Sequence, residues 1–164
     1  MFTRLLLFLL HLAVVPVPQA DHLGTQALLD AGEQKALQKA NNPSDRFKVY
    51  LEAAAVRLKM ASASHQTDEV GKFILPLQQY QAILQICSEE MDRNPPLKAG
   101  QAKRQEILLR KQIQFLSDLN PKVDLADQAL IRQLTESAQR LRSRFLKIFF
   151  GSEAIKDPTH KEFR

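Results

Sequence analysis

The stretch VGKFILPLQQYQAILQICSEEM, residues 70–91, indicates the fold class of this chain. Its apolar residues recur at alternating intervals of three and four, which is the period of an α-helix and not the period of two expected of a strand. They form the most regular apolar stripe in the sequence: Val70, Phe73, Leu77, Tyr80, Leu84, Cys87 and Met91. Because Ile74, Ile83 and Ile86 widen this stripe, we expect a central helix that neighbouring helices cover from more than one side.

Three other segments share this period. The first begins at Asn42-Pro43, which are a helix cap and a first-turn proline. The second follows Pro95-Pro96 and ends at Asn120-Pro121, and the third begins at Asp124 and ends at Gly151. Their apolar stripes are Phe47, Leu51, Ala54, Leu58 and Ala61; Leu108, Leu109, Ile113, Phe115, Leu116 and Leu119; and Leu130, Leu134, Ala138, Leu141, Phe145 and Ile148.

These segments predict an all-α protein. Short connections favour antiparallel neighbours, so we expect an up-and-down antiparallel four-helix bundle over residues 44–151. A short extra N-terminal helix is expected within residues 21–43, and residues 152–164 form a charged tail without a period. The alternative is a solenoid of two stacked helical hairpins. We disfavour it because the two halves share no side-chain pattern.

The first twenty residues predict export. Arg4 precedes an apolar run from Leu5 to Val15, interrupted by His11, and a segment with two prolines ends at Ala20. This order is that of a secretory signal peptide. The alternative is a short uncleaved anchor, which we disfavour because a span needs about 20 apolar residues. We therefore expect no transmembrane span after cleavage, and a periplasmic or extracellular location.

Composition agrees with a globular helical domain. Without Arg4, residues 21–164 carry 22 basic and 18 acidic residues, a mild net charge of +4. A chain of this size can bury a core without covalent staples. The single cysteine, Cys87, cannot form an internal disulfide, and its place in the apolar stripe predicts a buried small hydrophobic residue.

Patterns that carry catalysis or bind cofactors are missing from the sequence. The histidines that follow the signal are His22, His65 and His160, and no apolar stripe contains one of them. Zinc and covalent haem need Cys and His clusters that a single cysteine cannot supply. The sequence has no glycine-rich phosphate loop. We therefore predict no catalytic residue, no cofactor and no metal site, and expect a protein that is not an enzyme.

Charge is distributed unevenly between the expected helices. Residues 97–119 and 125–150 each carry five basic and two acidic side chains, whereas residues 67–93 carry two basic and five acidic ones. Arg140, Arg144 and Lys147 follow one helical row beside the apolar stripe, while Arg142 projects from another side. These four are the candidate anion-binding or partner-binding residues. The competing interpretation is a solvated face that complements the acidic helix, helped by Glu136 and Glu106 four residues before Arg140 and Arg110.

The sequence thus predicts an exported helical protein that acts by binding a partner or as a structural module of the envelope or secreted fraction. An alternative is a peripheral binder of an anionic membrane or a polyanionic envelope surface, through the basic C-terminal helices. Nucleic acid is not expected, because no aromatic residues alternate with the basic ones.

Overall fold

The computed structural model describes residues 28–66, 70–94 and 96–151, and helices make up its regular structure. The elements of the described part are α2 (Ala31–Lys39), α3 (Pro43–Gln66), α4 (Val70–Arg93), α5 (Ala99–Leu119), a 3-10 turn η1 (Asn120–Lys122) and α6 (Leu125–Phe150). The all-α prediction is confirmed for these residues. The signal segment 1–20, His22, the tail 152–164 and His160 lie outside them.

The helix boundaries follow from local sequence. Asn42 accepts from the backbone N–H of Asp45 at the start of α3, as expected for a cap. Asp124 is the N-cap of α6, and Gly151 ends that helix at a φ of +79°, where glycine is favoured. Helix α4 continues through Pro76, which is buried. Lys98 is the N-cap of α5, so that helix begins a few residues after Pro96.

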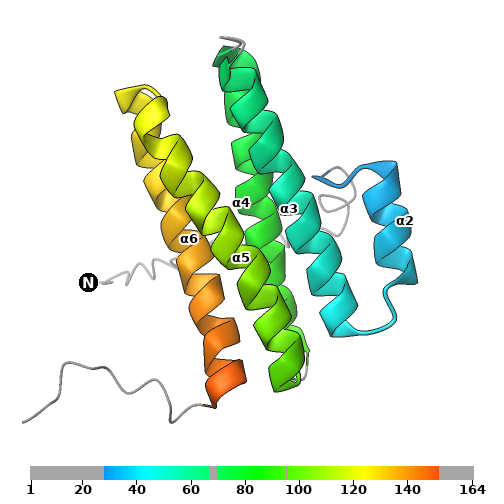
Figure 1. Cartoon of the computed structure of the whole chain (residues 1–164). Coiled ribbons are helices and arrows are strands. Elements are labelled where there is room, and N and C mark those ends of the chain that lie inside the picture. Colours follow the sequence, from blue (N-terminus) through cyan, green and yellow to red (C-terminus); the bar gives the residue numbers. More distant parts are fainter. Residues whose placement is uncertain (1–27, 67–69, 95, 152–164) are drawn as a thin grey trace, which may run out of the picture.

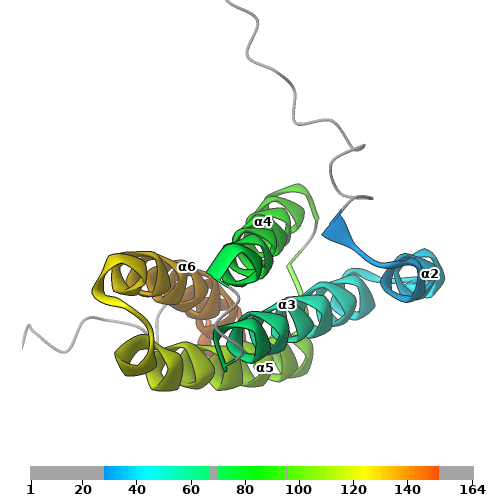
Figure 2. The ribbon, with the colours of Figure 1, turned by 90° about the horizontal axis from the view of Figure 1, so that it is seen from above.

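The four long helices form two hairpins, α3–α4 and α5–α6 (Figure 1). The hairpins pack through α3 on α5 and through α4 on α6. Helices α3 and α5 run in one direction and α4 and α6 in the other (Figure 1). Seen from above, the α3–α5 pair and the α4–α6 pair lie on opposite sides of the four-helix arrangement (Figure 2).

The predicted apolar stripes form the core. Every residue of the α3 stripe is buried, and Cys87 and the neighbouring Tyr80 on α4 are fully inaccessible. The α6 stripe is buried from Leu134 to Phe145, joined by Ile131. The sequence period therefore identified the inward faces of α3, α4 and α6 correctly.

Helix α5 is the exception, because its N-terminal half is buried through polar side chains. Ala102, Gln105 and Glu106 are buried in this half, ahead of Leu108, the first residue of the predicted apolar stripe. Gln112 is buried between Leu109 and Leu116 of the apolar stripe. This helix thus contacts the rest of the molecule through a mixed face, because amide side chains bond the backbone of α3 (Gln105 Nε2 to Ser44 O at 3.0 Å and Gln112 Nε2 to Leu51 O at 2.8 Å).

The N-terminal helix α2 packs on α3. Asp30 and Glu33 form a reciprocal capping box at its start. Glu33 also receives a bidentate pair of bonds from Arg57 of α3, at 3.0 and 2.7 Å, and Arg57 donates a third bond to the Leu28 carbonyl. Because the Arg57 side chain is only 7% exposed, this ion pair is the main polar anchor of α2.

Candidate functional site

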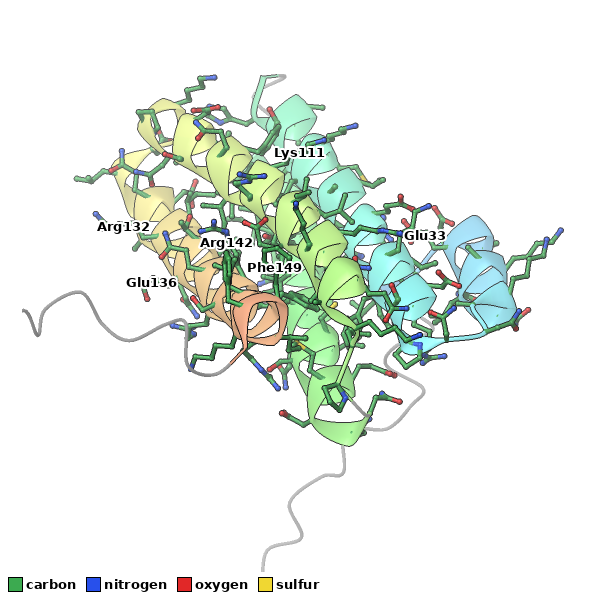
Figure 3. The ribbon with its side chains drawn as sticks, turned by 60° about the horizontal axis from the view of Figure 1, so that its bottom comes forward. Glu33, Lys111, Arg132, Glu136, Arg142 and Phe149 are labelled. Carbon is green, nitrogen blue, oxygen red and sulfur yellow. The ribbon has the colours of Figure 1, made fainter. Side chains whose placement is uncertain are left out.

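The four candidate residues of α6 do not share one environment. Arg142 lies on the side that faces α5, whereas Arg132 and Glu136 lie along the outer edge of the helix (Figure 3). Arg140 and Lys147 are exposed, and Arg142 and Arg144 are half-buried. The prediction that Arg142 projects separately from the other three agrees with its contact with α5.

Arg142 is held by a buried carboxylate. Its Nε donates to Glu106 Oε1 at 2.7 Å, and Arg110 Nε lies 3.8 Å from the same oxygen. The Glu106 side chain is only 8% exposed, so this acid needs a cationic partner. Arg142 therefore joins α6 to α5, and much of its charge is compensated within the protein.

Arg144 makes the corresponding contact with α4. Its Nη1 donates to the Ser88 hydroxyl at 2.6 Å and to the Ser88 carbonyl at 3.2 Å, and its Nη2 donates to Asp92. This contact crosses from the basic α6 to the acidic α4, which is the complementarity that the competing interpretation expected. The Arg144 side chain nevertheless remains 33% exposed.

Arg140 is the least constrained of the three arginines. Its Nη2 donates to Ser137 Oγ at 2.9 Å, and its Nη1 lies 3.8 Å from Glu136 Oε2. Arg140 and Glu136 side chains are 69% and 66% exposed, and such surface pairs contribute little. The Arg140 guanidinium is therefore able to reorient toward a ligand at small energetic expense.

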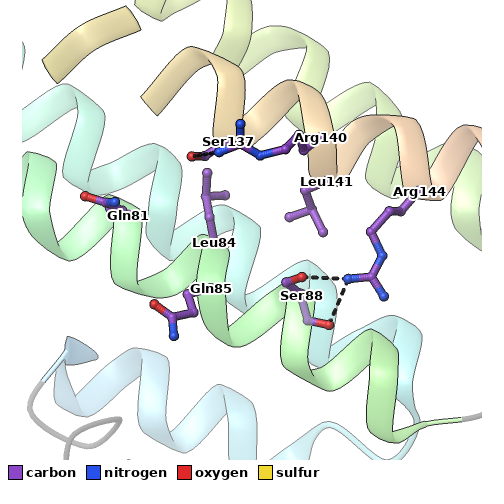
Figure 4. Close-up of a pocket in the computed structure, with 8 residues that line it drawn as sticks. All are labelled: Gln81, Leu84, Gln85, Ser88, Ser137, Arg140, Leu141 and Arg144. Atoms are coloured by element: carbon purple, nitrogen blue, oxygen red, sulfur yellow. Dashed lines mark hydrogen bonds between the residues drawn. The ribbon is translucent and has the colours of Figure 1, made fainter. Parts of the chain in front are cut away.

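Arg140 and Arg144 line the same groove between α4 and α6 (Figure 4). We call this depression, of about 340 Å³, the arginine groove. Leu84 and Leu141 face each other across it, and serine and glutamine side chains complete its walls. Its lining residues are Gln81, Leu84, Gln85, Ser88, Ser137, Arg140, Leu141 and Arg144.

The chemistry of the arginine groove is that of an anion site beside an apolar floor. The exposed Arg140 guanidinium supplies a planar pair of donors that matches carboxylate, phosphate or sulfate oxygens, whereas Nη1 and Nη2 of Arg144 already donate to Ser88 and Asp92 and add positive charge beside it. Ser137 and Gln85 add neutral hydrogen-bonding groups on its two walls. Leu84 and Leu141 close the base of the groove, but each is only 3% exposed. Lys147 lies outside this groove, on the adjoining surface of α6 that Arg140 and Arg144 also line.

Cys87 is next in sequence to the groove residue Ser88, but its side chain is buried in the core. Burial raises the pKa of the Cys87 thiol well above its ordinary value, and the charge of Glu90 adds to the rise. Burial likewise raises the pKa of Tyr80, with Cys87 as a second cause. Because the thiolate is the reactive form, Cys87 is poorly suited to nucleophilic chemistry.

The described ranges contain no cluster of three or more histidine, cysteine, aspartate or glutamate side chains arranged to hold a metal ion. His65 lies in the last turn of α3, where its Nε2 is 2.7 Å from the Lys122 carbonyl oxygen and its ring contacts Phe73. No helix of this part of the chain has the length and apolarity required to cross a bilayer.

Comparison with family models, curated proteins and solved structures found no match for this chain. The assignment of the arginine groove as a candidate site therefore depends on the positions and charges of its own residues. Sequence reasoning found Arg140 and Arg144 but missed the α4 side of the groove. Gln81, Gln85 and Ser88 follow helical spacing on α4, yet only the packing of α4 on α6 places them opposite arginines.

Proposed function

We propose that the chain is an exported, non-enzymatic helical protein that acts by binding a partner, or as a structural module, in the cell envelope or the secreted fraction. The predicted signal peptide supports the location. The absence of catalytic patterns from the sequence supports the non-enzymatic role. We also retain the up-and-down bundle as the proposed description of residues 44–151. The alternating directions of the four long helices agree with it, and two stacked hairpins would alternate in the same way (Figure 1).

The arginine groove carries the proposal for the binding site. Arg140 and Arg144 lie in one depression whose base is closed by two buried leucines, so the ligand that fits is an anionic group. An acidic side chain on a partner protein meets this description. Lys147 on the adjoining surface adds positive potential that attracts such a partner.

The second candidate function is peripheral binding to an anionic membrane or polyanionic envelope surface. The exposure of Arg132, Arg140 and Lys147 on α6 favours it. Glu136 interrupts this basic surface, and Leu125 and Phe150, 81% and 57% exposed, are the exposed large apolar side chains of α6 that a bilayer would accept. We rank it second because the arginine groove is concave, whereas a membrane offers a plane.

Capture from the native envelope tests the binding site. The purified wild-type chain is compared with Arg140→Glu, which reverses the charge inside the groove, and with Arg132→Glu, which makes the same change outside it. The proposal expects the amount of a specific bound component to fall about tenfold or more with Arg140→Glu, as for loss of an interfacial ion pair, and to stay unchanged with Arg132→Glu.

Vesicles separate the two candidate functions. Binding to vesicles of anionic lipid that weakens steeply with salt, and equally for both variants, would favour the membrane function over the groove. Export is tested by the N-terminus of the native protein, which we expect near Asp21 on material outside the cytoplasm. An intact Met1 on a cytosolic species would contradict export.

A further inference from the structure

A second groove lies between α3 and α5. Figure 2 shows these two helices side by side. We call this depression, of about 240 Å³, the apolar groove. Buried Leu51 and Leu58 are at its base, and half-buried Ala55, Leu108 and Phe115 are the surfaces that an occupant would touch. Val56 and Met60, next to Ala55 and Lys59 in sequence, are 42% and 48% exposed and extend the apolar surface of α3.

Lysines flank the apolar groove on both helices. Lys59 of α3 and Lys111 of α5 line it and are exposed, and neither forms an ion pair with any described residue. Glu52 also lines the groove, but Lys48 lies 3.9 Å from its carboxylate. Arg104 precedes Leu108 by one turn on the same face of α5 and is exposed. The α5 rim is therefore positive, and the α3 rim carries Lys59 together with Glu52, whose exposed pair with Lys48 is a weak surface contact, so basic groups outnumber the single acid around the groove.

We propose that the apolar groove binds an amphipathic α-helix of a partner protein, with acidic residues on both flanks of its apolar stripe. A seam between two helices accepts one row of apolar side chains at helical spacing, which is the helix-in-groove mode of recognition. Strand addition needs a free sheet edge, and the described residues include no strand. Acidic flanks follow from Lys59 on one rim and Lys111 on the other.

A second copy of this chain is the less suitable occupant. A two-fold contact through the apolar groove would bring Lys59 and Lys111 of one copy close to the same lysines of the other, and like charges in an interface disfavour pairing. The inference concerns a different surface from the arginine groove and holds even if that groove binds nothing.

The test uses two synthetic helical peptides and the purified chain. Each peptide has about 18 residues, long enough for an isolated helix to form in part. Both carry the same leucine stripe, with glutamate on the flanks of one and lysine on the flanks of the other. Fluorescence anisotropy measures the dissociation constant of each peptide. We expect the glutamate peptide to bind about tenfold or more tightly than the lysine peptide, as for a complementary against a like-charged rim.

Charge reversal locates the binding. The double variant Lys59→Glu, Lys111→Glu changes exposed positions, so it should fold normally by circular dichroism, and it should reverse the order of the two peptides. The matched control is Arg132→Glu, Lys147→Glu on α6, which changes the net charge equally and should leave the order unchanged. Ala55→Arg, which places a long side chain in the groove, should abolish binding of both peptides.

Other outcomes would overturn the proposal. One is failure of the wild-type chain to bind the glutamate peptide. Another is an equal change in peptide preference with both double variants, which would reduce the effect to net charge. A third is self-association of the chain that Ala55→Arg abolishes, because the occupant would then be a second copy.

Discussion

The two interfaces that join the hairpins use opposite kinds of polar contact. At α3–α5, the amides of Gln105 and Gln112 are buried, and each donates to a backbone carbonyl of α3. At α4–α6, the guanidinium of Arg144 donates to the Ser88 carbonyl and also to Asp92, with a third of its side chain exposed. Both contacts tie one hairpin to the other, but only the second uses charge.

The kind of polar contact at each interface indicates whether that contact contributes mainly to stability or mainly to binding. The two glutamine bonds each join residues 61 positions apart, so they fix one register between the parallel helices α3 and α5. Neutral buried amides leave the adjoining groove apolar, and the flanking lysines supply its charge. At α4–α6 the contact itself is charged and lies inside the groove. We therefore expect substitution of the buried glutamines at α3–α5 to affect mainly stability and substitution of Arg144 at α4–α6 to affect mainly binding through the arginine groove.

The largest expected effect is loss of a core leucine. Leu84→Ala and Leu134→Ala should each lower the free energy of unfolding by about 2–5 kcal/mol, because both side chains are buried and leave cavities. Denaturant unfolding measures this. Leu84 also forms part of the floor of the arginine groove, so a near-neutral Leu84→Ala would mean that α4 and α6 are less closely packed than described.

Substitution of Gln112 measures how much a buried amide contributes to stability. Gln112→Ala should lower the free energy of unfolding by about 2–3 kcal/mol, through a lost hydrogen bond and a cavity. Gln112 Oε1 is buried without a hydrogen-bond partner in the described part of the chain. Gln112→Leu removes that atom together with the bond, so it should cost about 1 kcal/mol or less. Equal effects of the two variants, measured by denaturant unfolding, would mean that the cavity contributes nothing and that the lost hydrogen bond accounts for the whole effect.

Substitution of Cys87 on α4 tests whether stability can change without a change in partner binding. Cys87→Ala should lower the free energy of unfolding by about 1 kcal/mol and leave partner capture unchanged, because the thiol is buried and does not line the arginine groove. A thiol reagent should label the folded protein slowly, and no disulfide-linked dimer should form without reductant. Rapid labelling, or lost binding at unchanged stability, would make Cys87 a functional residue.

The raised thiol pKa also predicts a pH dependence. Above about pH 9 the unfolded chain releases the Cys87 proton while the folded chain keeps it, so the unfolded state binds fewer protons and stability falls as pH rises. Tyr80 acts in the same direction at higher pH. Unfolding measured between pH 8 and pH 10, with Cys87→Ala as the control, should show a smaller decline in the variant.

Arg144 should show the smallest effect on stability. Arg144→Ala should lower the free energy of unfolding by about 1 kcal/mol or less, and less again at high salt, because its partner Asp92 is 67% exposed. Its effect on partner capture should be larger than this. An effect on stability as large as that of Gln112→Ala would remove the distinction between the two interfaces.

The sequence predicted most of the fold because α3, α4 and α6 bury continuous apolar stripes, and an apolar stripe is visible as a period. It did not predict how α5 packs, because Gln105, Glu106 and Gln112 appear solvent-facing in a sequence. Their burial depends on carbonyls of α3 and on Arg142, which are distant in the chain. The Asp30–Glu33 capping box carried a readable local signal, an acid followed by glutamate three residues later, that was overlooked.

The sequence identified the α6 residues of the arginine groove and missed its α4 residues. Arg140, Arg144 and Lys147 share a helical row that the sequence displays. Whether an arginine is compensated depends on which carboxylate packs beside it, and that is a property of the tertiary structure. Arg142 meets the buried Glu106, whereas Arg140 has only the exposed Glu136. The apolar groove was not predicted at all, since it exists only where α3 and α5 meet.

Site-directed photocrosslinking in the native host tests the binding role most directly. A photoreactive residue at Gln85, an exposed neutral position that lines the arginine groove, is compared with one at Gln114, an exposed glutamine of α5 outside both grooves. Partner binding through the arginine groove predicts one discrete adduct from position 85, lost when Arg140→Glu is added, and none from position 114. Adducts of equal yield from both positions, or an adduct at 85 that Arg140→Glu leaves intact, would contradict it.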